Sequence, residues 1–284
     1  MKIGLIDVDG HKFPNFALMK IANHHRQQGD TVEWVNHWER YDKVYKSKIF
    51  TFTPDNTIVV QSDEIIKGGR MYNDLFCDDA EPDYSLYPQY QHAYGFLTRG
   101  CIRRCAWCIV PKKEGGVRAY RDIETILQGR KTAILMDNNA LASQHGLQQL
   151  EKIIDIGCKV DINQGLDSRL VTDEIAKMLS KIKWIRYIRF ACDTTSAVEP
   201  LLKAVEKLNR HGVKNYRIFV YLLVKDVFEA NKRCGILKKM GVNPFAQAYR
   251  DEENKIKPTV EQKRFCRYVN HKAIFKSTEW EEYK

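Results

Sequence analysis

A chain of 284 residues with 44% apolar and 29% charged side chains has the composition of an ordinary folded protein, long enough for two domains. No apolar run in it approaches the length of a membrane span, and its first residues read as a strand rather than a signal peptide, so we expect a cytoplasmic protein with no membrane partner. The net charge of +10, from 46 basic and 36 acidic residues, permits an anionic partner such as nucleic acid without requiring one.

Residues 1–76 predict a small α/β domain. Strands are expected at 2–8 and 31–35 around a helix that stops at Gly29, and two further β-rich runs lie at 47–53 and 57–61. Strands that alternate with a helical segment favour a parallel sheet of flavodoxin type. The segment 77–94 is acidic, contains prolines and tyrosines without a clear period, and predicts a packed linker between domains.

The region 95–250 alternates apolar strands with helical patterns, which predicts a parallel sheet built from six strand–helix units. We expect its strands at 95–99, 132–137, 159–164, 187–193, 216–224 and 244–249, the fifth of them buried on both faces. Functional side chains of such sheets collect where strands end. The candidates at those ends are Asp137, Asn138, Asn139, the run Gln164–Arg169, Asp193, Thr194 and Thr195, with Gln247 and Tyr249 on the last strand.

Three of the eight cysteines, Cys101, Cys105 and Cys108, lie within eight residues on the loop after the first of these strands. Three thiolates on one short loop can hold three corners of a [4Fe-4S] cluster, which ordinarily takes four cysteines, and so leave one iron open. An open metal position distinguishes a catalytic site from a closed structural one. Three cysteines and a histidine could instead hold zinc, and that alternative stays open. The other five cysteines are single and are expected to be small buried hydrophobes; they are Cys77, Cys158, Cys192, Cys234 and Cys266.

At this loop the chain resembles the radical S-adenosylmethionine (radical SAM) superfamily, whose signature is C-x3-C-x-(aromatic)-C, with Trp107 at the aromatic position. The following Ile109-Val110-Pro111 looks like the cysteine loop of the methylthiotransferase branch. The resemblance implies a partial (βα)6 radical SAM barrel at 95–250, a [4Fe-4S] cluster and SAM as cofactors, and a reductant such as flavodoxin or ferredoxin. It further implies that SAM is cleaved to a 5'-deoxyadenosyl radical, which abstracts a hydrogen atom from an unidentified substrate.

The resemblance also implies cofactor-binding residues, among them Trp107 of the signature. The turn Asp137-Asn138-Asn139 lies where these enzymes approach the methionine amino group, although the usual Gly-Gly-Glu is missing. Ser168 and Arg169 belong to a run similar to the superfamily's "NGL-R" run, in which Arg169 would meet the methionine carboxylate, and Asp193 has the place of the acid that contacts the ribose. A helix cap or a loop-closing hydrogen bond would account for Asp193 and Ser168 equally. The pattern identifies no residue that acts on the substrate itself.

Seven basic residues surround the cysteine loop: Arg99, Arg103, Arg104, Lys112, Lys113, Arg118 and Arg121. Cations near an anionic cluster raise its reduction potential. The same charges could bind a phosphorylated substrate or could simply be solvated.

The loop Asp9–Pro14 looks like the Asp-x-His-x-x-Gly loop of cobalamin-binding domains, in which the histidine, His11 here, ligates cobalt. Pro14 replaces the glycine, and proline cannot adopt the backbone that glycine permits. We therefore expect a degenerate cobalamin-binding-like domain that serves as a scaffold or a substrate-docking surface rather than a working cobalamin site.

Residues 251–284 form a basic, aromatic C-terminal extension. Its apolar spacing predicts a helix at 260–273 that folds back on the core, with a nucleic-acid surface as the alternative reading. For the whole chain, a radical SAM enzyme is the preferred interpretation. The alternatives are methylthiotransferase-like modification of tRNA or another nucleic acid, a cobalamin-dependent radical methylase, and a non-catalytic iron–sulfur or zinc-binding module.

Overall fold

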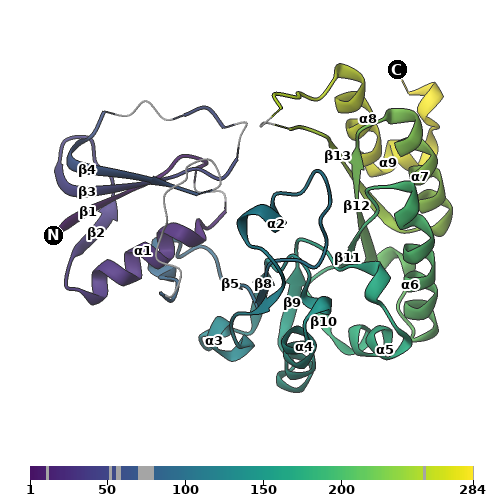
Figure 1. Cartoon of the computed structure of the whole chain (residues 1–284), viewed down its shortest axis with the longest axis horizontal. Helices are drawn as coiled ribbons and strands as arrows, with labels where there is room; N and C mark the ends of the chain where they lie inside the picture. The colour runs from purple at the N-terminus through teal and green to yellow at the C-terminus, as the bar shows by residue number, and fades with distance from the viewer. Residues whose placement is uncertain (11–12, 51–52, 56–58, 70–79, 252–253, 284) are drawn as a thin grey trace. The chain divides into compact units, whose positions relative to one another are not determined.

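The computed structural model describes residues 1–10, 13–50, 53–55, 59–69, 80–251 and 254–283. It consists of two compact units, Met1–Gln91 and His92–Lys284, which we call the N-terminal and the C-terminal unit. Each unit contains helices and parallel sheet, as the sequence predicted for the fold class (Figure 1). None of the helices in the described ranges is long and apolar enough to cross a membrane.

The N-terminal unit has a four-stranded parallel sheet in the order β2-β1-β3-β4, with one helix. Its elements are β1 (Lys2–Asp7), α1 (Phe16–Gln27), β2 (Thr31–Trp34), β3 (Arg40–Ser47) and β4 (Gln61–Gly68). The helix begins after Asn15, whose side chain accepts a hydrogen bond from the Leu18 amide, as an N-cap residue does. The first two strands and the helix lie where the sequence predicted them.

The predictions for the third and fourth strands were wrong in position, because β3 and β4 share only Ser47 and Gln61 with the runs expected at 47–53 and 57–61. Residues 51–52 and 57–58 of those runs lie outside the described residues. The expected run 47–53 contains Ile49 and Phe50, which are 37% and 42% exposed. Inside β3, charged residues alternate with the buried Tyr41 and Val44, so charge hid the strand from an apolar pattern. The edge strand β4 is mostly exposed, and charged side chains are common on such edges.

Of the segment 77–94 that was predicted as a linker, residues 80–91 pack within the N-terminal unit, whereas 92–94 belong to the C-terminal unit. It contains the 3-10 helix η1 (Tyr84–Leu86), and Tyr87 after it is fully buried. The Tyr87 hydroxyl donates to Asp7 at 2.9 Å, and its ring meets the Trp34 ring edge-on. Burial next to the Asp7 carboxylate raises the pKa of Tyr87. Residues 77–79 lie outside the described residues.

The C-terminal unit has two parallel sheets, in the orders β10-β9-β8-β5 and β11-β12-β13. Leu166 and Phe190 form a parallel bridge between them, in which the Leu166 amide donates to the Arg189 carbonyl at 2.7 Å. The strands are β5 (Ala93–Gly95), β8 (Thr132–Leu135), β9 (Lys159–Ile162), β10 (Lys183–Trp184), β11 (Ile188–Ala191), β12 (Ile218–Val224) and β13 (Asn243–Ala248), with the antiparallel pair β6 (Thr98–Arg99) and β7 (Arg118–Ala119). All six predicted strands have counterparts, and the short β10 was not expected.

Helices follow the strands and cover one side of these sheets (Figure 1). They are α3 (Ile123–Leu127), α4 (Gln144–Ile156), α5 (Asp173–Lys181), α6 (Val198–Arg210) and α7 (Val227–Met240), whereas the short α2 (Val110–Lys113) belongs to the loop between β6 and β7. Short 3-10 turns are η2 (Ala140–Ala142), η3 (Ser168–Leu170), η4 (Thr195–Ala197) and η5 (Asn215–Arg217). As predicted, Thr172 caps α5.

Strand β12 is buried on one face only, contrary to the prediction of burial on both. Ile218, Val220, Leu222 and Val224 are fully buried, whereas the residues between them are only partly buried. On that second face the rings of Phe219 and Phe245 stack with their centroids 5.7 Å apart. An aromatic, partly solvated face produces an apolar run in the sequence just as a doubly buried strand does.

The C-terminal helix folds back on the core, as its apolar spacing predicted. It is α8 (Val260–Asn270), followed by α9 (Lys272–Ser277) and η6 (Trp280–Glu282). Phe265 and Tyr268 are buried, and α8 packs against β13. The Asn270 side chain accepts from the Ala246 amide and donates to the Ala246 carbonyl, which closes the free edge of β13 at that point.

Candidate functional site

The cysteine loop leaves the sheet after β6 and returns at β7, and its base is closed by backbone contacts. Gly100 has a φ of +80°, and a Cβ added there would lie 2.2 Å from the Gly116 carbonyl oxygen. The next amide, that of Cys101, donates to the Gly115 carbonyl at 3.2 Å. Only glycine fits this approach of the two ends of the loop, so Gly100 fixes where the first thiol begins.

Glu114 ties the loop to the end of β8. One of its carboxylate oxygens accepts from the Gly100 amide at 2.9 Å, from Arg99 Nε at 3.0 Å and from Asn138 Nδ2 at 3.2 Å. The side chain is 17% exposed, so these bonds form at a largely desolvated point. Glu114 was not among the predicted site residues. Its signal was present, since it is the single acid between residues 101 and 121.

Asp137 anchors the turn from β5 to β6 and is completely buried. Its carboxylate accepts from the Leu97 amide at 3.0 Å, from the Thr98 amide at 2.6 Å and from the Thr98 hydroxyl at 2.7 Å. Burial raises its pKa to about 6 even though these donors oppose the shift. Asp137 therefore supports the start of the cysteine loop, and its contact with a cofactor stays a prediction.

The three thiols of the loop lie near one another at the carboxyl ends of the strands. Cys101 and Cys105 are partly exposed and Cys108 is exposed, and the Cys108 amide donates to the Cys105 carbonyl at 3.0 Å. Burial raises the pKa of the Cys105 thiol, neighbouring Cys108 and Cys101 add to the increase, and the Arg169 guanidinium opposes it. Arg169 thus lies within electrostatic range of the thiols.

Cys101 Sγ accepts two hydrogen bonds from nitrogen. The Arg103 amide lies 3.3 Å from the sulfur, and Asn139 Nδ2 lies 3.5 Å from it. Asn139 is 2% exposed, and its Nδ2 also lies 3.4 Å from Asp167 Oδ2. Its Oδ1 is buried and has no hydrogen-bond partner among the residues that the structure describes. Buried acceptors are ordinarily paired, so this buried oxygen is available to a donor from a bound group.

Asp167 holds two arginines beside the thiols. Arg103 Nε donates to it at 2.8 Å, and Arg169 donates through Nε at 2.6 Å and Nη2 at 3.1 Å. Burial alone would raise the pKa of Asp167, but the hydrogen bonds from Arg169 and Arg103 outweigh it and lower the pKa. Arg169 stays 45% exposed, whereas Asp167 is 6% exposed. Ser168, also predicted, is buried in η3. The sequence analysis included Asp167 only within its run and assigned it no role.

Trp107 joins the tip of the loop to the ends of β11 and β12. Its indole N–H donates to Asp193, which also accepts from the Leu223 amide at 3.0 Å. Burial raises the pKa of Asp193 in spite of these donors. The Lys225 ammonium lies 4.7 Å from the Trp107 ring centroid and 4.3 Å from that of Tyr249. Lys225 is a further residue that the sequence analysis missed.

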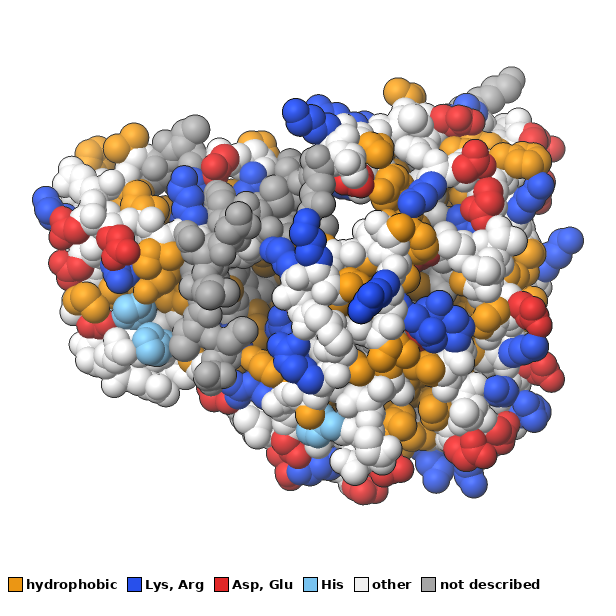
Figure 2. Space-filling view, in the orientation of Figure 1, with side chains coloured by type: hydrophobic (Ala, Val, Ile, Leu, Met, Phe, Trp, Pro, Cys, Tyr) orange, Lys and Arg blue, Asp and Glu red, His pale blue; other side chains and the backbone are white. Residues whose placement is uncertain are grey.

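Several of the basic residues predicted to surround the loop brace it. Arg99 and Arg103 bond Glu114 and Asp167, and Arg118 Nη1 donates to the Glu114 carbonyl at 2.7 Å. Lys and Arg side chains are also visible over the region of α2, on the face of the C-terminal unit that Figure 2 shows. Positive charge therefore lies beside the thiols.

The remaining described cysteines behave as small hydrophobes, as predicted. Cys158, Cys192 and Cys234 are buried and Cys266 is partly buried. Burial raises the pKa of Cys192 and of Cys266 to about 11 and that of Cys234 to about 12, which keeps these thiols neutral. Cys77 lies outside the described residues.

At the carboxyl edge of the N-terminal sheet, the side chains bond one another. Asn15 Nδ2 donates to Ser47 Oγ at 3.0 Å and lies 3.4 Å from Asp7 Oδ1, and Tyr87 occupies the other Asp7 oxygen. Asn15, Ser47 and Tyr87 are each at most 1% exposed. The prediction for His11 falls outside the described residues. The described polar side chains at this edge thus satisfy one another, and the cobalamin-binding-like character of the domain stays a prediction.

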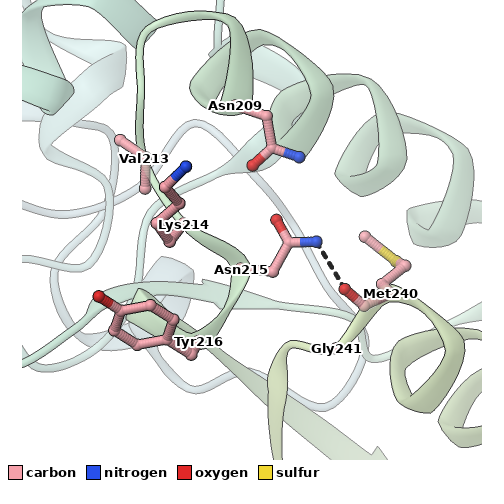
Figure 3. A pocket seen from close by; sticks show the side chains of 7 residues that line it. All are labelled: Asn209, Val213, Lys214, Asn215, Tyr216, Met240 and Gly241. Atoms are coloured by element: carbon pink, nitrogen blue, oxygen red, sulfur yellow. Dashed lines mark hydrogen bonds between the residues drawn. The ribbon is translucent and has the colours of Figure 1, made fainter.

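A surface pocket of about 550 Å³ lies at the other end of β12 from the cysteine loop. It is formed between the ends of α6 and α7 and the turn η5, where Asn215 Nδ2 donates to the Met240 carbonyl at 2.6 Å (Figure 3). Asn209 and Asn215 point toward one another across it (Figure 3). None of the predicted site residues lines this pocket.

The three-thiol loop fits an iron–sulfur cluster by the chemistry of its donors. Among the described residues, no group of three or more His, Cys, Asp or Glu side chains is gathered to hold a single metal ion. Ligands of one ion must converge on one point, whereas the thiolates of a cluster bind different irons. The donor set here matches an iron–sulfur cluster: three neighbouring thiols, two N–H donors on Cys101 and positive charge beside them.

Comparison with known proteins gives one informative match. Over 167 residues the chain is 28% identical to the ribosomal protein uS12 methylthiotransferase RimO of Caldanaerobacter subterraneus subsp. tengcongensis. The match covers 57% of this chain and 35% of that protein, so the chain spans about a third of the length of this relative. No protein-family model matches the chain. The relative is a methylthiotransferase, which is the branch of the radical SAM superfamily that the cysteine loop resembles.

Proposed function

We propose that this protein is a radical SAM enzyme in which Cys101, Cys105 and Cys108 bind three irons of a [4Fe-4S] cluster and the fourth iron binds SAM. The observation that carries the proposal is the gathering of these thiols with polar residues from the ends of three successive strands: Asn139 after β8, Asp167 and Arg169 after β9, and Asp193 after β11. We interpret the strand succession β5-β8-β9-β11-β12-β13 as the partial (βα)6 barrel of that superfamily. The methylthiotransferase relative supports the same assignment.

When bound, the cofactors would supply the radical chemistry, namely one-electron reductive cleavage of SAM to methionine and a 5'-deoxyadenosyl radical that takes a hydrogen atom from substrate. The protein residues position and shield them. Arg169, partly exposed and aligned by Asp167, would bind the methionine carboxylate through charge-assisted hydrogen bonds. Asn139 Oδ1, which lacks a donor among the described residues, would accept from the methionine amino group. Asp193 holds Trp107 and keeps acceptor capacity for a ribose hydroxyl.

A cysteine comparison tests this proposal. After anaerobic reconstitution, with dithionite or reduced flavodoxin as electron donor, we expect the wild-type protein to form 5'-deoxyadenosine from SAM and Cys105→Ala to form none. The matched control is Cys266→Ala, which removes a partly buried thiol of α8 and should leave cleavage unchanged. Retained SAM cleavage in reconstituted Cys105→Ala would defeat the proposal.

A methylthiotransferase-type reaction is the second candidate, and the relative and the Cys108-Ile109-Val110-Pro111 sequence favour it. The name of the relative gives ribosomal protein uS12 as its substrate, and the positive charge of this chain also suits nucleic acid. Mass spectrometry of tRNA and of ribosomal proteins after incubation with the reconstituted protein and SAM separates the two substrates. A methylthio group on either one supports this candidate. Turnover of SAM to 5'-deoxyadenosine with no such product leaves the broader proposal standing and excludes both of these substrates.

A further inference from the structure

The sulfur of Cys101 accepts hydrogen bonds from two N–H donors of the described residues. The Arg103 amide and Asn139 Nδ2 both reach Cys101 Sγ, at 3.3 and 3.5 Å. The first donor belongs to the loop backbone and is present whatever side chain follows. The second comes from a different element, the turn after β8, and depends on a single side chain.

The orientation of the Asn139 amide is determined by its two acceptors. Nδ2 lies between Cys101 Sγ and Asp167 Oδ2, and neither a thiolate nor an ionised carboxylate can donate. Asp167 is itself held by Arg103 and Arg169, whose hydrogen bonds favour its ionised form. With Asn139 only 2% exposed, water does not compete for this amide. The arrangement therefore directs an N–H group at one particular sulfur.

We propose that Asn139 is a positioning residue that donates an N–H···S hydrogen bond to the Cys101 ligand and raises the reduction potential of the cluster. The inference rests on the proposed function, because it presupposes a cluster on Cys101. Reduction adds negative charge that is shared by the thiolate sulfurs. A hydrogen bond to a sulfur stabilises the reduced state more than the oxidised state, and such bonds are among the factors that set cluster potentials.

The reduction potential of the reconstituted full-length protein, measured by a redox titration followed by electron paramagnetic resonance (EPR) without SAM, tests the inference. Asn139→Leu keeps the approximate volume of the side chain and removes the donor. We expect an equilibrium constant for one-electron reduction about tenfold smaller than in wild type, a shift of about 59 mV to more negative potential. Asn139→Asp, which puts a carboxylate oxygen near the sulfur, should shift the potential further in the same direction.

The matched control is Asn138→Leu. Asn138 is the preceding residue of the same turn, but its side chain bonds Glu114 and not a sulfur. We expect the wild-type potential from it. Equal potentials in wild type and Asn139→Leu would overturn the inference and leave the proposed function intact. Loss of the cluster from both Asn139 variants but not from Asn138→Leu would also overturn it, since a lost N–H···S bond shifts a potential without breaking three iron–thiolate bonds. A wild-type protein without a reducible cluster would overturn both proposals.

Discussion

The carboxyl ends of the parallel strands are used in opposite ways in the two units. In the N-terminal unit, Asp7 ends β1 and Ser47 ends β3, and their side chains bond Asn15 and Tyr87. Ser47, Asn15 and Tyr87 are each at most 1% exposed. In the C-terminal unit, the same edge carries the cysteine loop, where Cys108 is exposed and Arg169 is 45% exposed. Strand ends of parallel sheets are the usual place for ligands in both kinds of fold.

The difference lies in the segments that the chain brings to each edge. The segment predicted as a linker places Tyr87 at the N-terminal edge. There the Tyr87 hydroxyl donates to Asp7 and its ring contacts the Trp34 ring. At the C-terminal edge, the buried Asp137 holds the base of a loop whose own reactive groups stay accessible. A strand end thus becomes a site only where the polar groups are not all paired with one another.

The largest loss of stability is expected from substitution of Asp137, the buried carboxylate that holds the base of the cysteine loop. Asp137→Ala removes the acceptor of three buried donors and should lower the free energy of unfolding of the C-terminal unit by about 3–5 kcal/mol. Urea denaturation measures this loss, and Asp155→Ala on the exposed face of α4 is the matched control. A loss below about 1 kcal/mol would show that Asp137 does not hold the loop.

The pH dependence of stability tests the same carboxyl without removing its bulk. The pKa of Asp137 is raised to about 6 in the folded state, so its favourable contribution is present below the unfolded pKa near 3.8 and is lost as the pH rises through 6. From this group we expect the free energy of unfolding to fall by about 3 kcal/mol between pH 4 and pH 7. Asp137→Asn should lack this component. Because burial also raises the pKa of Asp193, the difference between wild type and variant is the quantity to compare, and parallel pH profiles would contradict the assignment.

A smaller loss of stability is expected at the carboxyl edge of the N-terminal sheet. Tyr87→Phe removes the hydroxyl that donates to Asp7 and should cost about 1–2 kcal/mol of stability in the N-terminal unit. Hydrogen exchange resolved by peptide reports each unit separately. Protection should fall in β1 and α1 and stay unchanged in β8 and β9. Unchanged protection in β1 would mean that the Tyr87 hydroxyl does not stabilise this edge.

The smallest loss of stability is expected from substitution of Glu114, which ties the cysteine loop to the end of β8. Glu114→Gln keeps an acceptor for Gly100 but weakens the bond to Arg99, at an expected cost of about 1 kcal/mol. Because the loss is local, faster exchange of the amides at 100–117 is the measurement of choice. Faster exchange throughout the unit would contradict a local role for Glu114.

Local pattern accounts for most of the fold and for the centre of the site. The spacing of Cys101, Cys105 and Cys108 identified the loop, and the apolar periodicity located the helices and the strands of the C-terminal unit. It failed at β3, whose charged residues alternate with buried ones, and at β12, whose second face is aromatic and partly exposed.

Contacts between distant segments account for what the sequence could not show. Glu114 and Asp167 act on residues up to 64 positions away, and no periodicity encodes such pairs. Asp137 and Asn139 look alike in the sequence, as polar residues after one strand. Only burial and partners separate an anchor of the backbone from a donor to a sulfur.

The most direct test of the central claim is the EPR spectrum of the anaerobically reconstituted and reduced wild-type protein, recorded before and after addition of SAM. Our account predicts a cluster of about four irons per chain whose signal changes when SAM binds the iron that has no protein ligand. A cluster whose spectrum is unaffected by saturating SAM, or a protein that binds no cluster through Cys101, Cys105 and Cys108, would contradict it.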